Sequence, residues 1–226
     1  LTESALGLVL AVKPPLLRRQ LERAERDGLI EAVVRPGGKK HYVLAEFGLR
    51  LLAARAGVPF RRFANHTPFV AALPRAGGRL QTLTRQFEHT VGANSFMLAC
   101  LRNCSDRDSP MLVRWQNPIE AAVRFESGCV RRTLRPDGSG DVVQRAKPHS
   151  FFLEWDRGTE RINVLLEKLT RYAAYYSSTT AASANVLLVV TPTPHREAVV
   201  CRAVSAVMRP EAERARVLTT VASLVD

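Results

Sequence analysis

Residues 151–160 read FFLEWDRGTE, and this stretch decides the fold of the second half of the chain. Side chains of a β-strand alternate between its faces, so Phe151 and Leu153 are predicted on one face, with Glu154 and Asp156 on the other. At the rise of a strand, the two carboxylates stand about 7 Å apart. Two acids on one face of an apolar strand favour either a metal site or ion pairs with nearby arginines.

The stretch lies among short runs rich in β-forming residues, separated by Pro, Gly, Ser and Asp. Helical periods flank these runs, and they predict an α/β (α+β) domain with a mixed central sheet flanked by helices. The predicted strands are MLVRWQ (111–116), AAVRFE (121–126), CVRRTLRPDG (129–138), FFLEWD (151–156), NVLLVV (185–190) and a last strand within 215–226. The predicted helices span 79–103, 158–178 and 195–208.

Residues 1–60 predict a different kind of domain, with the order helix, helix, hairpin, helix. Leu17, Leu21 and Ala24 form one apolar stripe at helical spacing, and Gly28 stands where a helix C-terminal cap belongs. Two β-rich runs then flank a Pro-Gly-Gly turn. This order is that of a winged helix-turn-helix, in which the second helix enters the major groove of DNA. Residues 61–78, rich in Pro, Gly and Arg, are predicted as a linker to the domain at 79–226.

The charge balance favours a polyanionic partner. The chain of 226 residues carries a net charge of +12 and is 46% hydrophobic. Half of the excess lies in residues 1–62, where 12 Lys/Arg face 6 Asp/Glu. We therefore predict double-stranded DNA as the partner of the first domain. The predicted DNA-binding residues of the second helix and the wing are Lys13, Arg18, Arg19, Arg23, Arg26, Lys39, Lys40 and His41. The alternative is a solvated helix face, since nearby acids can pair with these arginines.

The remaining composition favours a cytoplasmic protein without a membrane partner. No apolar run reaches the roughly 18 residues of a membrane span. Four cysteines are expected to stay reduced. Cys100 and Cys104 share a helical spacing, but they have neither a second pair nor an adjacent His to complete a zinc site.

Several separated blocks resemble the replication-relaxation proteins of plasmids and integrative elements. They are EHTVGANSFMLACL, LRPDG, FFLEWDRGTER, EKLTRYAAYY and VLLVVTP, in this order. The resemblance implies an N-terminal winged helix and a C-terminal domain similar to the PD-(D/E)XK, or restriction-endonuclease-like, fold. It also implies a role in replication, DNA relaxation or mobilisation of a mobile element.

Carried over to this chain, the resemblance assigns the aspartate of the PD motif to Asp137 and the strand glutamate to Glu154. The motif expects lysine two residues later, where this chain has Asp156. Lys168 on the next helix is the candidate to replace that lysine. The candidate catalytic residues are thus Asp137, Glu154, Asp156 and Lys168, and the candidate ligands of Mg²⁺ or Mn²⁺ are the three acids.

Two functions stay open from the sequence. The first is a DNA-binding protein whose nuclease-like domain lacks catalysis and needs no cofactor, which the missing lysine favours. The second is a metal-dependent endonuclease or nickase. Further candidate partners are a relaxase, a transposase, a replication protein or a second copy of the chain in a homodimer.

Overall fold

The computed structural model describes residues 1–34, 38–60, 78–102, 110–118, 120–178, 185–208 and 217–224. Within the helix that begins at Gly78, side chains are described from Phe87 onward. The chain divides into an N-terminal unit, Leu1–Asn94, and a C-terminal unit, Ser95–Asp226. The predicted linker at 61–78 lies outside the described residues except for Gly78.

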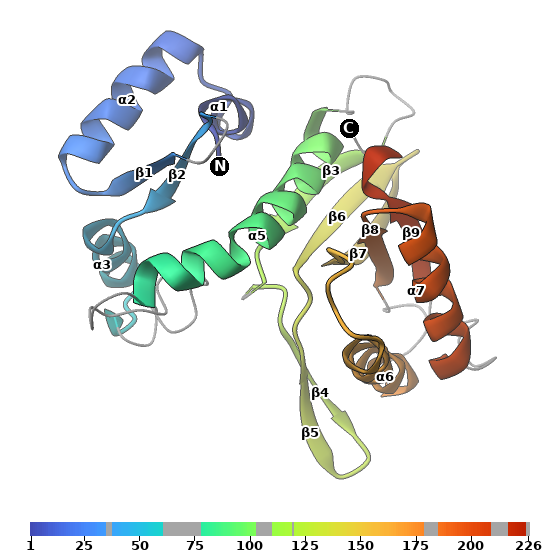
Figure 1. The fold of residues 1–226 in the computed structure, drawn as a ribbon. Coiled ribbons are helices and arrows are strands. Elements are labelled where there is room, and N and C mark those ends of the chain that lie inside the picture. Colours follow the sequence, from blue (N-terminus) through green and yellow to red (C-terminus); the bar gives the residue numbers. More distant parts are fainter. Residues whose placement is uncertain are drawn as a thin grey trace. The chain divides into compact units, whose positions relative to one another are not determined.

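The N-terminal unit has the predicted order of elements. Helices α1 (Glu3–Leu10) and α2 (Pro14–Arg26) precede strands β1 (Ile30–Val34) and β2 (Lys40–Leu44), and α3 (Glu46–Arg55) follows. The two strands form an antiparallel pair, as Figure 1 shows in blue. Gly28 has a φ of +67°, so it terminates α2 in the left-handed conformation that glycine adopts without strain. Leu17 and Leu21 are buried, which confirms the predicted apolar stripe of α2.

The C-terminal unit is built on a mixed five-stranded sheet with the order β3-β6-β7-β8-β9. Its strands are β3 (Met111–Gln116), β6 (Gly138–Gln144), β7 (Lys147–Trp155), β8 (Val186–Thr191) and β9 (Val217–Val221). The first three run antiparallel, and β7, β8 and β9 run parallel. A mixed sheet was predicted, but β6 was not, because its sequence GSGDVVQ is poor in β-forming residues.

Helices cover both faces of this sheet (Figure 1). Helix α5 (Gly78–Arg102) places Phe96 edge-on to the ring of Phe151, with 6.1 Å between ring centroids. On the opposite face, Phe152 packs against Tyr172 and Tyr175 of α6 (Ile162–Ser178). Helix α7 (Pro194–Val207) adds buried side chains to the same core. The alternation predicted for β7 is therefore confirmed, and Glu154 lies on the face that α6 covers.

Strands β4 (Val123–Ser127) and β5 (Val130–Leu134) form a separate antiparallel hairpin. The sequence places both runs among the strands of the C-terminal domain, without separating them from its central sheet. They instead leave it between β3 and β6, and they extend alongside α6 (Figure 1).

Within the described ranges, no helix is both long enough and apolar enough to cross a membrane.

Candidate functional site

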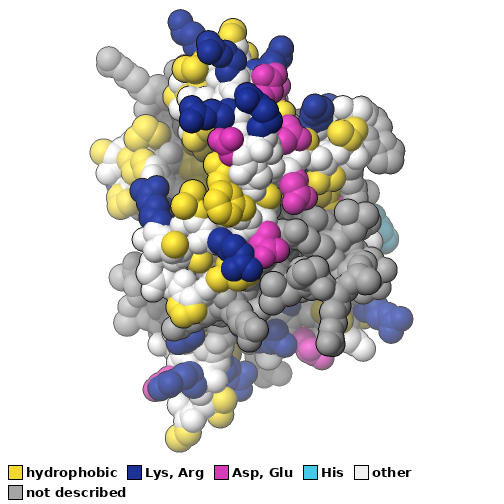
Figure 2. Space-filling model, turned by 90° about the vertical axis from the view of Figure 1, so that its left-hand side faces the viewer, with side chains coloured by type: hydrophobic (Ala, Val, Ile, Leu, Met, Phe, Trp, Pro, Cys, Tyr) yellow, Lys and Arg dark blue, Asp and Glu magenta, His cyan; other side chains and the backbone are white. Residues whose placement is uncertain are grey.

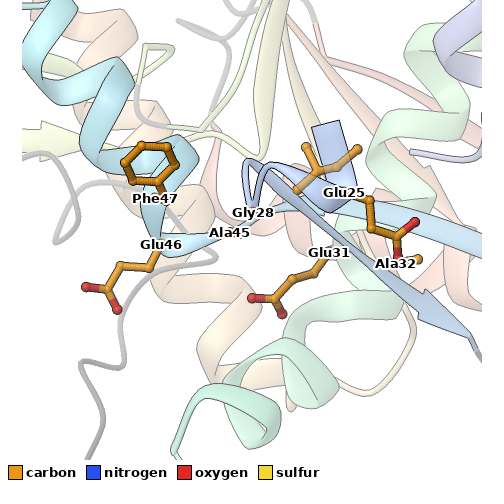
Figure 3. A pocket seen from close by; sticks show the side chains of 8 residues that line it. Glu25, Gly28, Glu31, Ala32, Ala45, Glu46 and Phe47 are labelled. Atoms are coloured by element: carbon orange, nitrogen blue, oxygen red, sulfur yellow. The ribbon is translucent and has the colours of Figure 1, made fainter. Parts of the chain in front are cut away.

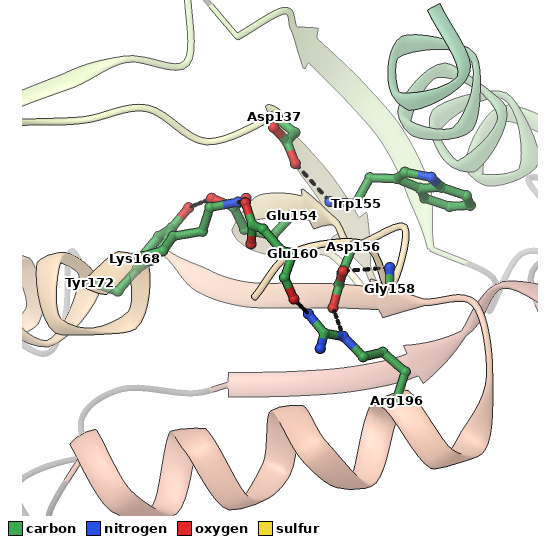
Figure 4. Close-up of polar contacts among 9 residues, drawn as sticks. All are labelled: Asp137, Glu154, Trp155, Asp156, Gly158, Glu160, Lys168, Tyr172 and Arg196. Atoms are coloured by element: carbon green, nitrogen blue, oxygen red, sulfur yellow. Dashed lines mark hydrogen bonds and ion pairs between the residues drawn. The ribbon is translucent and has the colours of Figure 1, made fainter. Parts of the chain in front are cut away.

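Glu154 is the centre of a buried polar cluster between β7 and α6. The residue is 4% exposed, and both of its carboxylate oxygens have a partner. Lys168 Nζ donates to Oε2 at 2.9 Å, and the hydroxyl of Tyr172 donates to Oε1 at 2.5 Å. Both donors project from α6 toward the end of β7 (Figure 4). Lys168 Nζ also lies 3.6 Å from Oε1 of Glu160.

Asp137 joins this end of the sheet because β6 begins immediately after it. Gly138 pairs with Leu153, and the backbone N–H of Asp137 donates to the carbonyl of Leu153 at 2.9 Å. Its carboxylate accepts from the backbone N–H of Trp155 at 2.8 Å. The negative charge of Asp137 acts on both Glu154 and Lys168. The structure thus brings together three of the four candidate catalytic residues.

Asp156 has a different set of partners. Its Oδ2 accepts from Nε of Arg196 at 2.6 Å, and its Oδ1 accepts from the backbone N–H of Gly158 at 2.7 Å. Arg196 comes from α7, and it also donates to the carbonyl of Glu160 at 3.1 Å. The side chains of Asp156 and Arg196 are 6% and 13% exposed. Asp156 therefore takes part in a buried ion pair that ties the end of β7 to α7 (Figure 4).

The fit of this site to Mg²⁺ or Mn²⁺ follows from these partners. A hard cation takes carboxylate oxygens as ligands, yet both oxygens of Glu154 already accept from Lys168 and Tyr172. Asp156 is committed to Arg196. Across the described residues, no group of three or more His, Cys, Asp and Glu side chains is arranged to hold a metal ion. The described arrangement of the cluster does not fit a resident cation.

Burial dominates the ionisation of the cluster. It raises the pKa of Glu154 to about 8, and the charge of Asp137 adds to this rise while Lys168 opposes it. Burial acts in the opposite direction on Lys168, but the charge of Glu154 in its ionised form and the charge of Asp137 outweigh it and raise the pKa of that amine. Burial and the neighbouring Glu154 also raise the pKa of Tyr172, which keeps its hydroxyl a proton donor.

We expect this raised pKa to make the stability of the C-terminal unit fall as pH rises. Between the ordinary carboxyl value of 4.5 and about 8, folded Glu154 retains a proton that the unfolded chain has lost. The free energy of unfolding then decreases by up to about 1.4 kcal/mol per pH unit. The measurement is urea unfolding followed by tryptophan fluorescence, because Trp115 and Trp155 both lie in this unit.

The matched variants for this prediction are Glu154→Gln and Glu160→Gln. Glutamine at 154 has no carboxyl proton to lose, so the decline with pH should disappear. Glu160 also contacts Lys168 but lies at the periphery of the cluster, and its variant should keep the decline. An equal decline in both variants would contradict the assignment to Glu154.

The predicted basic surface of the N-terminal unit is solvent-exposed. Every predicted DNA-binding lysine and arginine of α2 and the hairpin is exposed, namely Lys13, Arg18, Arg19, Arg23, Arg26, Lys39 and Lys40. Arg18 pairs with Glu3 at 3.2 Å, and Arg23 pairs with Asp27 at 3.7 Å. Figure 2 shows Lys and Arg side chains at the top of the molecule, with Asp and Glu side chains among them. Exposed pairs of this kind contribute little, so these arginines can exchange partners.

His41 differs from the other predicted DNA-binding residues. It is half-buried, and its ring meets Phe87 edge-on at 5.0 Å between centroids. Its Nδ1 lies 3.3 Å from the carbonyl of Lys39. Within the unit, His41 thus packs between β2 and α5.

A second surface of the N-terminal unit is acidic. A cavity of about 470 Å³ is lined by Glu25, Gly28, Ile30, Glu31, Ala32, Ala45, Glu46 and Phe47. Figure 3 shows the three glutamates around its rim. Glu46 is paired with Arg50 at 2.7 Å. Carboxylates repel phosphates, so this rim is a less favourable surface for a polyanion than the exposed arginines of α2.

The comparisons with known proteins settle the family. The sequence model described as replication-relaxation matches residues 10–190, which is well over half of the chain. The chain belongs to the replication-relaxation family. The family predicted from the sequence blocks is thereby confirmed, and it indicates a role in replication or relaxation of a plasmid or mobile element. Comparison with curated proteins gives no match, and neither does comparison with solved structures.

In this replication-relaxation protein, the matched segment includes most residues of the buried polar cluster around Glu154. Asp137, Glu154 and Lys168 lie within 10–190, whereas Arg196 lies beyond it. Sequence reasoning missed Arg196 and the hydrogen bond of Tyr172. The helical period carries a signal for the second, since Tyr172 follows the buried Leu165 and Leu169 at spacings of seven and three residues and therefore faces the core. No local sequence pattern indicated that Arg196 would pair with Asp156, because the two residues lie 40 positions apart.

Proposed function

We propose that this replication-relaxation protein is a DNA-binding protein that acts in the replication, relaxation or mobilisation of a plasmid or mobile element. Its N-terminal unit acts as a winged helix on double-stranded DNA. Its C-terminal unit acts as a PD-(D/E)XK-like domain in which catalysis is lost or altered. The observation that carries the proposal is the exposed basic surface of α2.

Helix α2 supports DNA binding because its two faces are clearly divided. Leu17 and Leu21 anchor it in the unit, while its arginines point to solvent. The order of α1, α2 and the β1–β2 hairpin suits a winged helix, whose second helix would enter the major groove. Arginine presents a planar fork of donors that matches phosphate and base edges.

The altered catalysis is supported by the partners of the carboxylates. Glu154 accepts two hydrogen bonds from α6, and Asp156 stands where the motif expects lysine but is held by Arg196. Each carboxylate is therefore satisfied within the protein. A fully satisfied cluster of this kind stabilises the packing of α6 and α7 on the sheet.

The second candidate function is a metal-dependent endonuclease. The observation that favours it is the position of Lys168 Nζ beside Glu154, with Asp137 close by. A lysine that reaches the two carboxylates from α6 would compensate for the one missing from the strand motif. Because the described arrangement does not fit a cation, this function requires Lys168 to leave Glu154.

The test of DNA binding is the triple variant Arg19→Gln, Arg23→Gln, Arg26→Gln. Each lost phosphate contact lowers the slope of log affinity against log salt by about 1, so we expect a decrease of about 3. Affinity at low salt should fall roughly tenfold or more. Fluorescence anisotropy with a labelled DNA duplex measures both quantities.

The control removes three exposed charges from the C-terminal unit, Arg145→Gln, Lys147→Gln, Arg202→Gln. It should bind DNA with the wild-type slope. If the α2 variant and this control lose affinity equally, α2 is not the DNA-contacting helix, and net charge alone explains the binding.

A further inference from the structure

The β4–β5 hairpin is a rigidly anchored arm on the C-terminal unit. Val123, Phe125 and Leu134 pack into the core that α6 forms with the sheet. The ring of Phe125 meets Tyr175 edge-on, with 5.5 Å between centroids. The arm extends beside α6 and away from the five-stranded sheet (Figure 1). One face of the hairpin is thus fixed to the protein, and its other face is free to contact a partner.

The other face of the arm is basic. Arg124 is directly opposite Thr133, and Glu126 is directly opposite Arg131, so these four side chains share one face. Arg135 continues the same alternation beyond β5. All three of these arginines are exposed. Arg132 is exposed as well. Residues 123–135 therefore contain four arginines and a single acidic residue.

The acid of the arm neutralises little of this charge. Glu126 lies 3.7 Å from Arg131, and the two side chains are 71% and 79% exposed. Exposed ion pairs contribute about 0–1 kcal/mol and yield readily to another anion. Within the part of the chain that the structure describes, Arg124, Arg132 and Arg135 form no ion pair. The arm therefore presents a row of cations for which the unit supplies almost no counter-charge.

The position of the arm relates this row to the carboxylate cluster. Arg135 precedes Asp137 by two residues, so the base of the arm lies at the same end of the sheet as Glu154 and Lys168. Arg131 and Arg135 lie four residues apart, about 13 Å along the strand, and Arg124 lies across the hairpin opposite Thr133, at the level between them. The three guanidinium groups therefore form a staggered row, and such a row of forked donors suits a chain of repeating phosphates better than the irregular carboxylates of an acidic protein.

We propose that the β4–β5 hairpin is a second DNA-contacting element, in which Arg124, Arg131 and Arg135 bind backbone phosphates of double-stranded DNA. The inference rests on the proposed function as a DNA-binding protein. It adds a contact that lies outside α2 and the β1–β2 hairpin. Phosphate contacts of this kind position DNA without reading its sequence.

The test is the triple variant Arg124→Gln, Arg131→Gln, Arg135→Gln in the full chain, with a duplex of arbitrary sequence. Three lost phosphate contacts should lower the slope of log affinity against log salt by about 3. The charge-matched control Arg145→Gln, Lys147→Gln, Arg202→Gln should keep the wild-type slope. All six positions are exposed, so neither triple variant should change the thermal unfolding transition. An unchanged transition verifies that each variant is folded.

A direct probe of the arm is Cys129 at its tip. Cys129 and Cys201 are both exposed free thiols, which makes Cys201 an internal reference. Duplex DNA should slow alkylation of Cys129 several-fold and leave Cys201 unchanged. The inference about the arm is wrong if the wild-type protein binds DNA but the arm variant keeps the wild-type slope. It is also wrong if DNA binds without protecting Cys129. Either result leaves the proposed function standing. Wild-type protein that does not bind DNA overturns the proposed function as well.

Discussion

Replacing Arg196 with methionine should destabilise the C-terminal unit by about 3–5 kcal/mol, because it leaves the buried carboxylate of Asp156 without its cation. Both side chains are largely buried, so water compensates only in part for the lost partner. The variant also removes the donor to the carbonyl of Glu160. Urea unfolding followed by fluorescence of Trp115 and Trp155 measures the change within this unit.

The double variant Asp156→Asn, Arg196→Met shows whether the lost stability comes from the unpaired charge of Asp156. Asparagine keeps an oxygen for the N–H of Gly158 but carries no charge, so the double variant should recover a large part of the lost stability. A single Arg196→Met variant as stable as wild-type protein would mean that the ion pair does not hold β7 to α7.

The second large effect concerns Gly48 in α3. A Cβ added at this residue would lie 2.1 Å from the backbone carbonyl oxygen of Leu29. That oxygen also accepts from the N–H of Ala45 at 3.0 Å, so the backbone cannot shift without losing a hydrogen bond. We expect Gly48→Ala to destabilise the N-terminal unit by about 3 kcal/mol or more. Far-UV circular dichroism should show an early helical transition, while tryptophan fluorescence should report unchanged unfolding of the C-terminal unit.

Gly7→Ala is the matched control in the same unit. An added Cβ there meets its nearest neighbours at 3.5 Å, an ordinary contact, within helix α1. Alanine is favoured over glycine inside a helix by about 0.5–1 kcal/mol. The two variants should therefore shift the stability of the N-terminal unit in opposite directions, and a loss in Gly7→Ala would contradict this account of the close approach at Gly48.

The sequence predicted the elements well wherever a local period or a turn signal existed. The stripe of Leu17 and Leu21 identified α2, and the alternation around Phe152 identified β7 and the face of Glu154. The glycine-rich strand β6 gave no such signal, and β6 rather than β5 is the neighbour of β7. Asp137 lies at the same end of the sheet as Glu154 because β6 starts beside it, and not because β5 joins the sheet.

The sequence identified most residues of the candidate site, but it did not show which of them form hydrogen bonds or ion pairs with one another. The resemblance to the family selected Asp137 and Glu154, and the absence of the motif's lysine led to Lys168 on the next helix. The partner of Asp156 depends on how α7 packs on the parallel part of the sheet. A contact between residues 40 positions apart is set by tertiary packing, which no local pattern of one sequence reveals.

The most direct measurement is incubation of the protein with supercoiled plasmid in Mg²⁺, Mn²⁺ or EDTA, with one gel read for both mobility shift and nicking. We predict that the protein retards the plasmid in all three conditions without nicking it, and that Glu154→Gln behaves in the same way. Metal-dependent nicking that disappears in Glu154→Gln would contradict the loss of catalysis and establish the cluster as an active site. Plasmid that migrates unchanged would contradict DNA binding itself.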